Sequence, residues 1–322
     1  MTKKLRDKVV VITGASSGVG RMAARLFAEG GAAVVLAART RQTLDEVAAE
    51  CEAAGGQALV VPTDVRGEDA VRELARRAVE RFGRIDVWVN NAAVTLFART
   101  EEAPYEAYRQ VIETNLFGYI HGARAVLPRF RAQGQGVLIN VDSVAGIVGQ
   151  PYTSAYCVTK FGIRGLGESL RQELLDAPGI HVCTVMPATI DTPLFQHAAN
   201  YTGRAVQAMP PVATAERIAR AIVGLAVRPR RELIVGGAAR LMAAQHNLAP
   251  AMMERMMARQ VEKKHFQDRS EPPTAGNLFE PMPQWSGVSG GWKRSGSGRG
   301  RKLVMGLALG LPAAAALFLL RR

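Results

Sequence analysis

The chain has 322 residues, of which 48% are hydrophobic, so it can bury a full core and is neither an intrinsically disordered nor a fibrous protein. Its formal net charge is +13, but seven basic and no acidic residues follow residue 292, which leaves only +6 for residues 1–292 and disfavours a nucleic-acid-binding domain. The three cysteines and five histidines show neither disulfide nor metal-ligand spacing, which argues for a reducing compartment and against a zinc site.

Short apolar runs alternate with longer segments of helical period along most of the chain. The first five runs are rich in Val, Ile and Leu on both faces, which is typical of strands buried between two helical layers. The segments between them, such as residues 41–54 and 71–82, carry apolar residues three and four positions apart. This alternation predicts an α/β fold with a Rossmann-type doubly wound parallel sheet and helices on both faces. We expect about seven strands, at residues 8–13, 33–38, 57–61, 85–89, 136–141, 180–186 and 232–235.

A glycine-rich turn, residues 13–20, follows the first predicted strand and opens a helix. Glycines there allow a tight turn and a close approach to a pyrophosphate, and the free amides of a helix N-terminus favour an anion. A plain tight turn is the alternative, but the position in the first βαβ unit favours dinucleotide binding. The candidate cofactor residues of this turn are Gly14, Ser16, Ser17, Gly18, Val19 and Gly20.

The end of the second strand lacks the carboxylate that an NAD-binding enzyme uses against the ribose 2′-hydroxyl. Arg39 lies there instead, and a guanidinium matches the geometry of a 2′-phosphate. Arg41 and Ser16 are possible helpers, although Arg41 fits equally well as a solvated residue in the first turn of a helix. The pattern therefore predicts NADP(H) as the cofactor.

Tyr156 and Lys160 lie one turn apart on the same face of a predicted helix. A neighbouring ammonium lowers the pKa of a phenol, so this pair predicts a general acid/base. Ser143 ends the fifth strand, at the sheet edge where such folds bind ligands. Asn115 falls inside a helical segment, residues 105–130, where an amide is unfavourable unless it holds something, such as a water chain leading to Lys160.

With these residues the sequence resembles the short-chain dehydrogenase/reductase family over residues 6–240. The resemblance implies that Tyr156 is the acid/base, that Lys160 tunes it and binds the nicotinamide ribose, that Ser143 polarises the carbonyl and that Asn115 supports a proton relay. It also implies contacts of Asp64 and Val65 with the adenine, of Asn91 with the loop beside the cofactor, of Pro187 with the cofactor site, and of Thr192 with the nicotinamide carboxamide.

The sequence departs from the family pattern at Ala93 and Ala188, where the family has glycines. We expect altered loop geometry rather than lost activity, since every proton-transfer residue is present. Substrate specificity is expected from residues 188–204 and the C-terminal extension. Four methionines at helical spacing (252, 253, 256 and 257) suit either an apolar pocket or, as we favour, a packing or oligomer face.

The C-terminal part changes character after the predicted catalytic domain, residues 1–268. Residues 269–302 are rich in Pro, Gly and Ser and are predicted to form a flexible basic linker. Residues 303–320 carry no charge, are flanked by basic residues and predict a transmembrane or membrane-associated helix, with an interfacial or a core helix as alternatives. No secretory signal opens the chain, so we expect a cytoplasmic catalytic domain anchored to a membrane by its C-terminus.

Together these patterns predict an NADP-dependent oxidoreductase that transfers a hydride between NADP(H) and a carbonyl or alcohol group of an apolar small molecule. A non-catalytic dinucleotide sensor or scaffold at the membrane is the alternative, which the complete catalytic set disfavours. Nucleic-acid binding through residues 299–302 lacks interleaved aromatic residues. The family resemblance implies a homo-oligomer.

Overall fold

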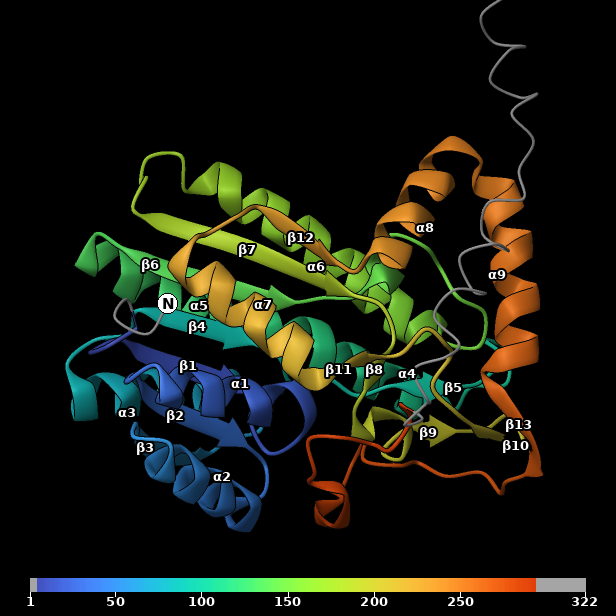
Figure 1. The fold of residues 1–322 in the computed structure, drawn as a ribbon, viewed down its shortest axis with the longest axis horizontal. Helices are drawn as coiled ribbons and strands as arrows, with labels where there is room; N and C mark the ends of the chain where they lie inside the picture. The colour runs from blue at the N-terminus through green and yellow to red at the C-terminus, as the bar shows by residue number, and fades with distance from the viewer. Residues whose placement is uncertain (1–4, 294–322) are drawn as a thin grey trace, which may run out of the picture. The chain divides into compact units, whose positions relative to one another are not determined.

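A seven-stranded parallel sheet forms the centre of the computed structural model, which describes residues 5–293. The strand order β12-β7-β6-β4-β1-β2-β3 reverses direction beside β1, as in a doubly wound fold (Figure 1). All seven expected strands are present, so the predicted fold class is confirmed. Their bounds are β1 Val9–Thr13, β2 Ala33–Ala38, β3 Gln57–Pro62, β4 Val87–Asn90, β6 Gly136–Val141, β7 Ile180–Pro187 and β12 Glu232–Val235.

Two layers of helices cover the sheet because successive apolar side chains of each strand point to opposite faces. Val10 and Ile12 of β1 pack in one core cluster with Phe27, whereas Val9 and Val11 belong to a second cluster on the other face. The first layer contains α1 (Gly18–Glu29), α2 (Arg41–Ala53) and α7 (Ala215–Val227), and the second contains α3 (Glu68–Phe82), α5 (Gly118–Gln133) and α6 (Ser154–Glu173) (Figure 1).

The expected helix over residues 105–130 is interrupted by a π-helical turn. Helix α4 (Tyr105–Ile112) leads into the π-turn Glu113–Phe117, and α5 continues from it. Asn115 lies in that turn, fully buried. A π-turn inserts one extra residue into a helical turn and is frequent at functional sites. The side chain of Asn115, which is unfavourable in a regular helix, therefore marks a local change of helix type.

Helices α8 (Gly237–Leu248) and α9 (Pro250–Lys264) follow the sheet, and short strand pairs form beside its carboxyl edge. Met257 is buried in a cluster with Phe97 and Phe266, and Met253 is buried as well, whereas Met252 and Met256 are exposed. None of these four methionines lines the main cavity, in agreement with a packing face. The short strands are β5 Leu96–Phe97, β8 Ile190–Asp191, β9 Ala199–Asn200, β10 Arg204–Val206, β11 Ala213–Thr214 and β13 Phe266–Ser270.

Residues 277–292, here called the cover segment, pack on the catalytic domain, which differs from the flexible linker that we expected from residue 269 onward. Leu278 is fully buried, and its carbonyl accepts a hydrogen bond from the Gln110 side chain at 2.8 Å. The Trp292 amide donates to the Asp191 carboxylate at 2.7 Å. We expected a flexible linker because ordering a Pro- and Gly-rich segment costs conformational entropy. The contacts of Leu278 and Trp292 offset that cost.

The predicted membrane segment, residues 303–320, and the last part of the expected linker lie outside the described residues. Within residues 5–293, no helix combines the length and the apolar character needed to cross a bilayer.

Candidate active site

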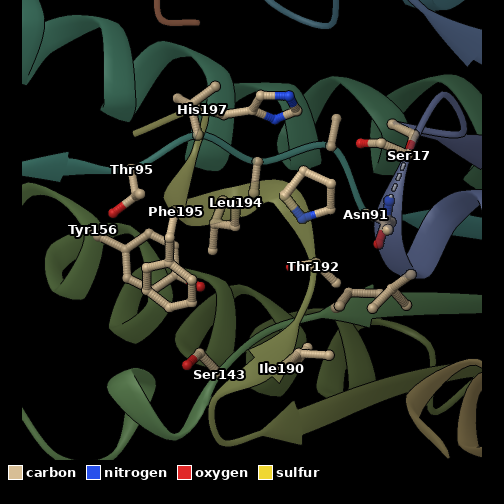
Figure 2. A pocket seen from close by; sticks show the side chains of 18 of the residues that line it. Ser17, Asn91, Thr95, Ser143, Tyr156, Ile190, Thr192, Leu194, Phe195 and His197 are labelled. Atoms are coloured by element: carbon tan, nitrogen blue, oxygen red, sulfur yellow. Dashed lines mark hydrogen bonds between the residues drawn. The ribbon is translucent and has the colours of Figure 1, made fainter. Parts of the chain in front are cut away.

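One deep cavity lies at the carboxyl edge of the sheet, where the loops after β1, β2, β3, β4, β6 and β7 meet. Figure 2 shows Ser17 and Asn91 at one end and Tyr156 and Ser143 at the other. Every candidate site residue except Gly20 and Asn115 lines it, although these residues come from both halves of the chain. The lining candidates are Gly14, Ser16, Ser17, Gly18, Val19, Arg39, Asp64, Val65, Asn91, Ser143, Tyr156, Lys160, Pro187 and Thr192.

The glycine-rich turn is packed so tightly at Gly14 and Gly20 that a side chain would not fit at either position. Gly14 has a φ of 66°, which favours glycine. A Cβ at Gly20 would lie 2.1 Å from the Gly14 carbonyl oxygen, so Gly20 shapes the turn from behind rather than lining the cavity. The turn therefore has the close backbone packing that a dinucleotide-binding loop needs.

Asn91 ties this turn to the loop after β4. Its side-chain amide donates hydrogen bonds to the carbonyl oxygens of Thr13 at 3.0 Å and Gly14 at 3.1 Å, and its backbone amide donates to the Thr13 hydroxyl at 3.0 Å. The adjacent Ala93 also lines the cavity, so its methyl group borders the space beside the turn.

Arg39 lies at the other side of the turn, but its guanidinium is engaged by the cover segment. It donates to the carbonyl oxygens of Asn277 at 2.7 Å and Phe279 at 3.1 Å. Burial lowers the pKa of Arg39, and the charge of Asp64 opposes that effect. Asp64 itself pairs with Arg66, a cavity-lining residue that the sequence reasoning missed.

Arg41 does not line the cavity. It is exposed at the start of α2, where its guanidinium lies 3.8 Å from the Asp45 carboxylate one turn later. This placement favours the alternative in which Arg41 is a solvated helix residue.

Tyr156, Lys160 and Ser143 converge at the end of β6. The Lys160 ammonium donates to the Val141 carbonyl at 2.8 Å and lies 5.3 Å from the centroid of the Tyr156 ring. Ser143 caps a short 3₁₀ turn by accepting the Ala145 amide at 3.1 Å. Tyr156 and Ser143 therefore lie at the same end of the cavity (Figure 2), and Lys160 lines the cavity with them.

The electrostatics of this group are governed first by burial. Burial raises the pKa of Tyr156, the charge of Asp142 adds to that rise, and the Ser143 hydroxyl opposes it. Burial lowers the pKa of Lys160 to about 8, which the charge of Asp142 opposes. The net direction for Tyr156 is opposite to the lowering that we expected from Lys160, because a fully buried phenol loses the solvation that its anion needs.

This arrangement agrees with what comparison with known proteins finds. A family model described as short chain dehydrogenase matches residues 8–201. The chain belongs to the short-chain dehydrogenase family. It is 36% identical over 305 residues to the uncharacterized oxidoreductase YxnA of Bacillus subtilis. The aligned region covers 92% of this chain and 85% of the relative.

Two further relatives of this short-chain dehydrogenase have more specific descriptions. The cis-4-hydroxycyclohexanecarboxylate dehydrogenase of Sinomonas cyclohexanicum is 38% identical over 230 residues, covering 70% of this chain and 92% of the relative. The structure of an alcohol dehydrogenase from the archaeon Thermococcus sibiricus, complexed with 5-hydroxy-NADP, matches with a TM-score of 0.61 at 29% identity and covers 71% of this chain and 95% of that one. The chain is therefore a dehydrogenase-type oxidoreductase acting on CH–OH groups, and a nicotinamide dinucleotide is the indicated cofactor.

Asn115 of this dehydrogenase lies behind the cavity rather than in its wall. Its side-chain oxygen accepts the Val94 amide at 2.8 Å, and its amide group donates to the Val94 carbonyl at 2.9 Å and to the Thr159 hydroxyl at 3.4 Å. The side chain thus joins the loop after β4 to the residue next to Lys160.

The substrate end of the cavity is largely apolar and was only partly foreseen. Leu194 and Phe195 come from the loop after β7 that we expected to set specificity (Figure 2). Met242 comes from α8. His265 also lines this end, where its ring centroid lies 5.6 Å from that of Phe195. His197 lines the cavity beside the cover segment, near the backbone of Met282 and Trp285, and burial lowers the pKa of both histidines. Neither histidine stands out in the sequence, because only the fold places residues 197 and 265 in the cavity wall.

Proposed function

We propose that this chain is an NADP(H)-dependent reductase or dehydrogenase of an apolar carbonyl or alcohol, with Tyr156 as the general acid/base. The observation that carries the proposal is the convergence of Tyr156, Ser143 and Lys160 at one end of a cavity whose other end is the glycine-rich turn. The glycine-rich turn fits a dinucleotide because its backbone is closely packed at Gly14 and Gly20, where a Cβ would collide with neighbouring atoms.

The nicotinamide, when bound, supplies or accepts the hydride. Tyr156 then donates a proton to the substrate oxygen in reduction and removes it in oxidation. Ser143 donates a hydrogen bond to the same oxygen, which stabilises the charge that develops there. The Lys160 ammonium, held by the Val141 carbonyl, favours the phenolate of Tyr156 by its charge.

Arg39 and the absence of a carboxylate at the end of β2 support NADP(H) rather than NAD(H). The Thermococcus sibiricus relative, complexed with 5-hydroxy-NADP, supports the same choice. An apolar substrate is supported by the cavity wall at the substrate end, formed by Leu194, Phe195, Met209 and Met242.

Tyr156→Phe tests the proposal because it keeps the ring and removes the transferable proton. After a screen of aldehydes, ketones, quinones and sterol-like carbonyls with NADPH identifies a substrate, we expect turnover of the variant to fall by about 10²-fold or more, while NADPH binding measured by fluorescence is retained. Near-normal turnover of Tyr156→Phe would overturn the assignment. NADPH binding without turnover on any of these classes would instead favour the sensor or scaffold.

A further inference from the structure

Asp142 is a buried carboxylate that the proposed reaction leaves without a role. It follows β6 directly, between Val141 and Ser143, and its exposed fraction is 2%. Its backbone amide donates to the Val185 carbonyl at 2.9 Å, which fixes the residue at the edge of the sheet. Gly146 makes room for the side chain, since a Cβ there would lie 2.7 Å and 3.0 Å from the two carboxylate oxygens.

This carboxylate lacks the partners that a buried acid normally has. Neither oxygen accepts a hydrogen bond of ordinary geometry within residues 5–293, although the adjacent Ser143 amide favours the charged form. On the same two strands, β6 and β7, the paired residues Asn140 and Thr184 each have a side-chain polar atom without a partner among the described residues. Because a buried unpaired carboxylate is costly, its presence beside the catalytic group calls for a compensating charge.

Lys160 supplies that charge. Its ammonium is 1% exposed and is held 2.8 Å from the carbonyl oxygen of Val141, the residue whose peptide bond leads into Asp142. Gly146 shows how closely Asp142 approaches this residue, because a Cβ there would lie 2.7 Å from an Asp142 carboxylate oxygen and 2.9 Å from the Lys160 backbone oxygen. The charge of Asp142 opposes the lowering of the Lys160 pKa by burial.

The other ionisable groups around Asp142 are engaged elsewhere or neutral. Arg164 of α6 pairs with Glu232 of β12 at 3.0 Å, which leaves little of its charge for Asp142. The phenols of Tyr156 from α6 and Tyr119 from α5 complete the set, and the Asp142 charge raises the pKa of each.

We infer that Asp142 is a positioning residue of this active site, whose carboxylate supplies the negative charge that keeps the buried Lys160 ammonium protonated. The inference rests on the proposed function, in which Tyr156 and Lys160 act together. Burial raises the pKa of Asp142, and the charge of Lys160 opposes this rise.

The test is the pH dependence of kcat/KM for reduction with NADPH in Asp142→Asn. Removing the negative charge lowers the pKa of both Lys160 and Tyr156, and both must hold their protons for reduction. The alkaline limb of the profile should therefore move to lower pH by about one unit, the lower end of the shift that a nearby charge produces. The acid limb for oxidation, where Tyr156 must lose its proton, should move in the same direction.

Thr184→Val is the matched control, because it removes a buried hydroxyl on the adjacent strand without changing charge. It is expected to leave both limbs in place even if it alters stability or kcat. Should Asp142→Asn not fold, as judged by thermal unfolding and NADPH binding, the smaller Asp142→Ser carries the same expectation.

Unmoved limbs in the folded Asp142 variant, or equal shifts in Thr184→Val, would overturn the inference. These outcomes are separable from failure of the proposed function, which is judged by Tyr156→Phe. If Tyr156→Phe loses turnover while the limbs of Asp142→Asn do not move, only the role of Asp142 is wrong.

Discussion

At the scale of single residues, Arg39 has two competing uses. Its guanidinium is bonded to backbone carbonyl oxygens of the cover segment, and a 2′-phosphate would approach the same group. Carbonyl oxygens carry only partial charge, so a phosphate dianion is the stronger partner for a half-buried guanidinium. Arg39 is therefore expected to set cofactor choice while also holding the cover segment.

Exchanging the charge at this position should change the cofactor. Ala38→Asp combined with Arg39→Leu is expected to lower the ratio of kcat/KM with NADPH to that with NADH by about 10²-fold, since a charge-assisted hydrogen bond is lost and a repulsive carboxylate is introduced. Steady-state kinetics with both cofactors measure it. Arg41→Leu is the matched control and should leave the ratio unchanged. Equal efficiency with the two cofactors in the unmodified protein would contradict the NADP assignment.

At the scale of elements, a helix or strand could be predicted from the sequence when a periodic apolar face stabilises it, but not when a few tertiary contacts do. Strand β1 and helix α3 were predicted because buried strands and amphipathic helices repeat apolar residues with their own periods. The cover segment has no such period, and its position depends on a few side chains such as Leu278 and Trp292 and on its carbonyl oxygens. The composition of the cover segment does not indicate which of its residues will make these tertiary contacts.

The residues of the candidate site could likewise be predicted from the sequence only in part. Tyr156 and Lys160 could be found because both lie on one helix at a fixed spacing. Asp142, Arg66 and His197 were missed because their roles depend on partners that only the tertiary fold supplies. Within the cover segment, the aromatic residues Phe279, Trp285 and Trp292 were the signal that would have argued against a linker.

The cover segment should strengthen cofactor binding rather than take part in the chemistry. Leu278→Ala removes its fully buried anchor, and such a change costs about 2–5 kcal/mol of local packing. We expect the Kd for NADPH to rise about tenfold or more, with kcat at saturating NADPH little changed. Fluorescence titration and limited proteolysis of residues 277–292 measure this. Phe279→Ala, at a neighbouring side chain that is 42% exposed, is the control. An unchanged Kd in Leu278→Ala would show that the segment does not enclose the cofactor.

At the scale of the whole molecule, the fold brings the two halves of the chain to one sheet edge. The glycine-rich turn follows β1, and Ser143 follows β6, on the other side of the point where the strand order reverses. Parallel strands present their carboxyl ends together, so Gly14 and Ser143, which are 129 positions apart in the sequence, line one cavity. All cofactor and catalytic candidates lie at or before Thr192, and the cover segment ends at residue 292.

The last prediction concerns location. Residues 303–320 carry no charge in the sequence, would span about 27 Å as a helix at 1.5 Å per residue, and are flanked by basic residues. We propose that they anchor the protein to a membrane, where an apolar substrate dissolved in lipid is concentrated. Deleting residues 303–322 should release an active enzyme, because the deletion removes no residue of the cavity or of the cover segment.

Fractionation after a carbonate wash tests the anchor. The full chain is expected in the membrane pellet and the shortened chain in the supernatant, with the same kcat on a water-soluble carbonyl. A second deletion, of residues 271–322, also removes the cover segment and should weaken NADPH binding, which separates the contribution of the cover segment from that of the anchor. Finding the full chain wholly in the supernatant would refute the anchor, since eighteen uncharged, largely apolar residues that cross a bilayer are not extracted by carbonate.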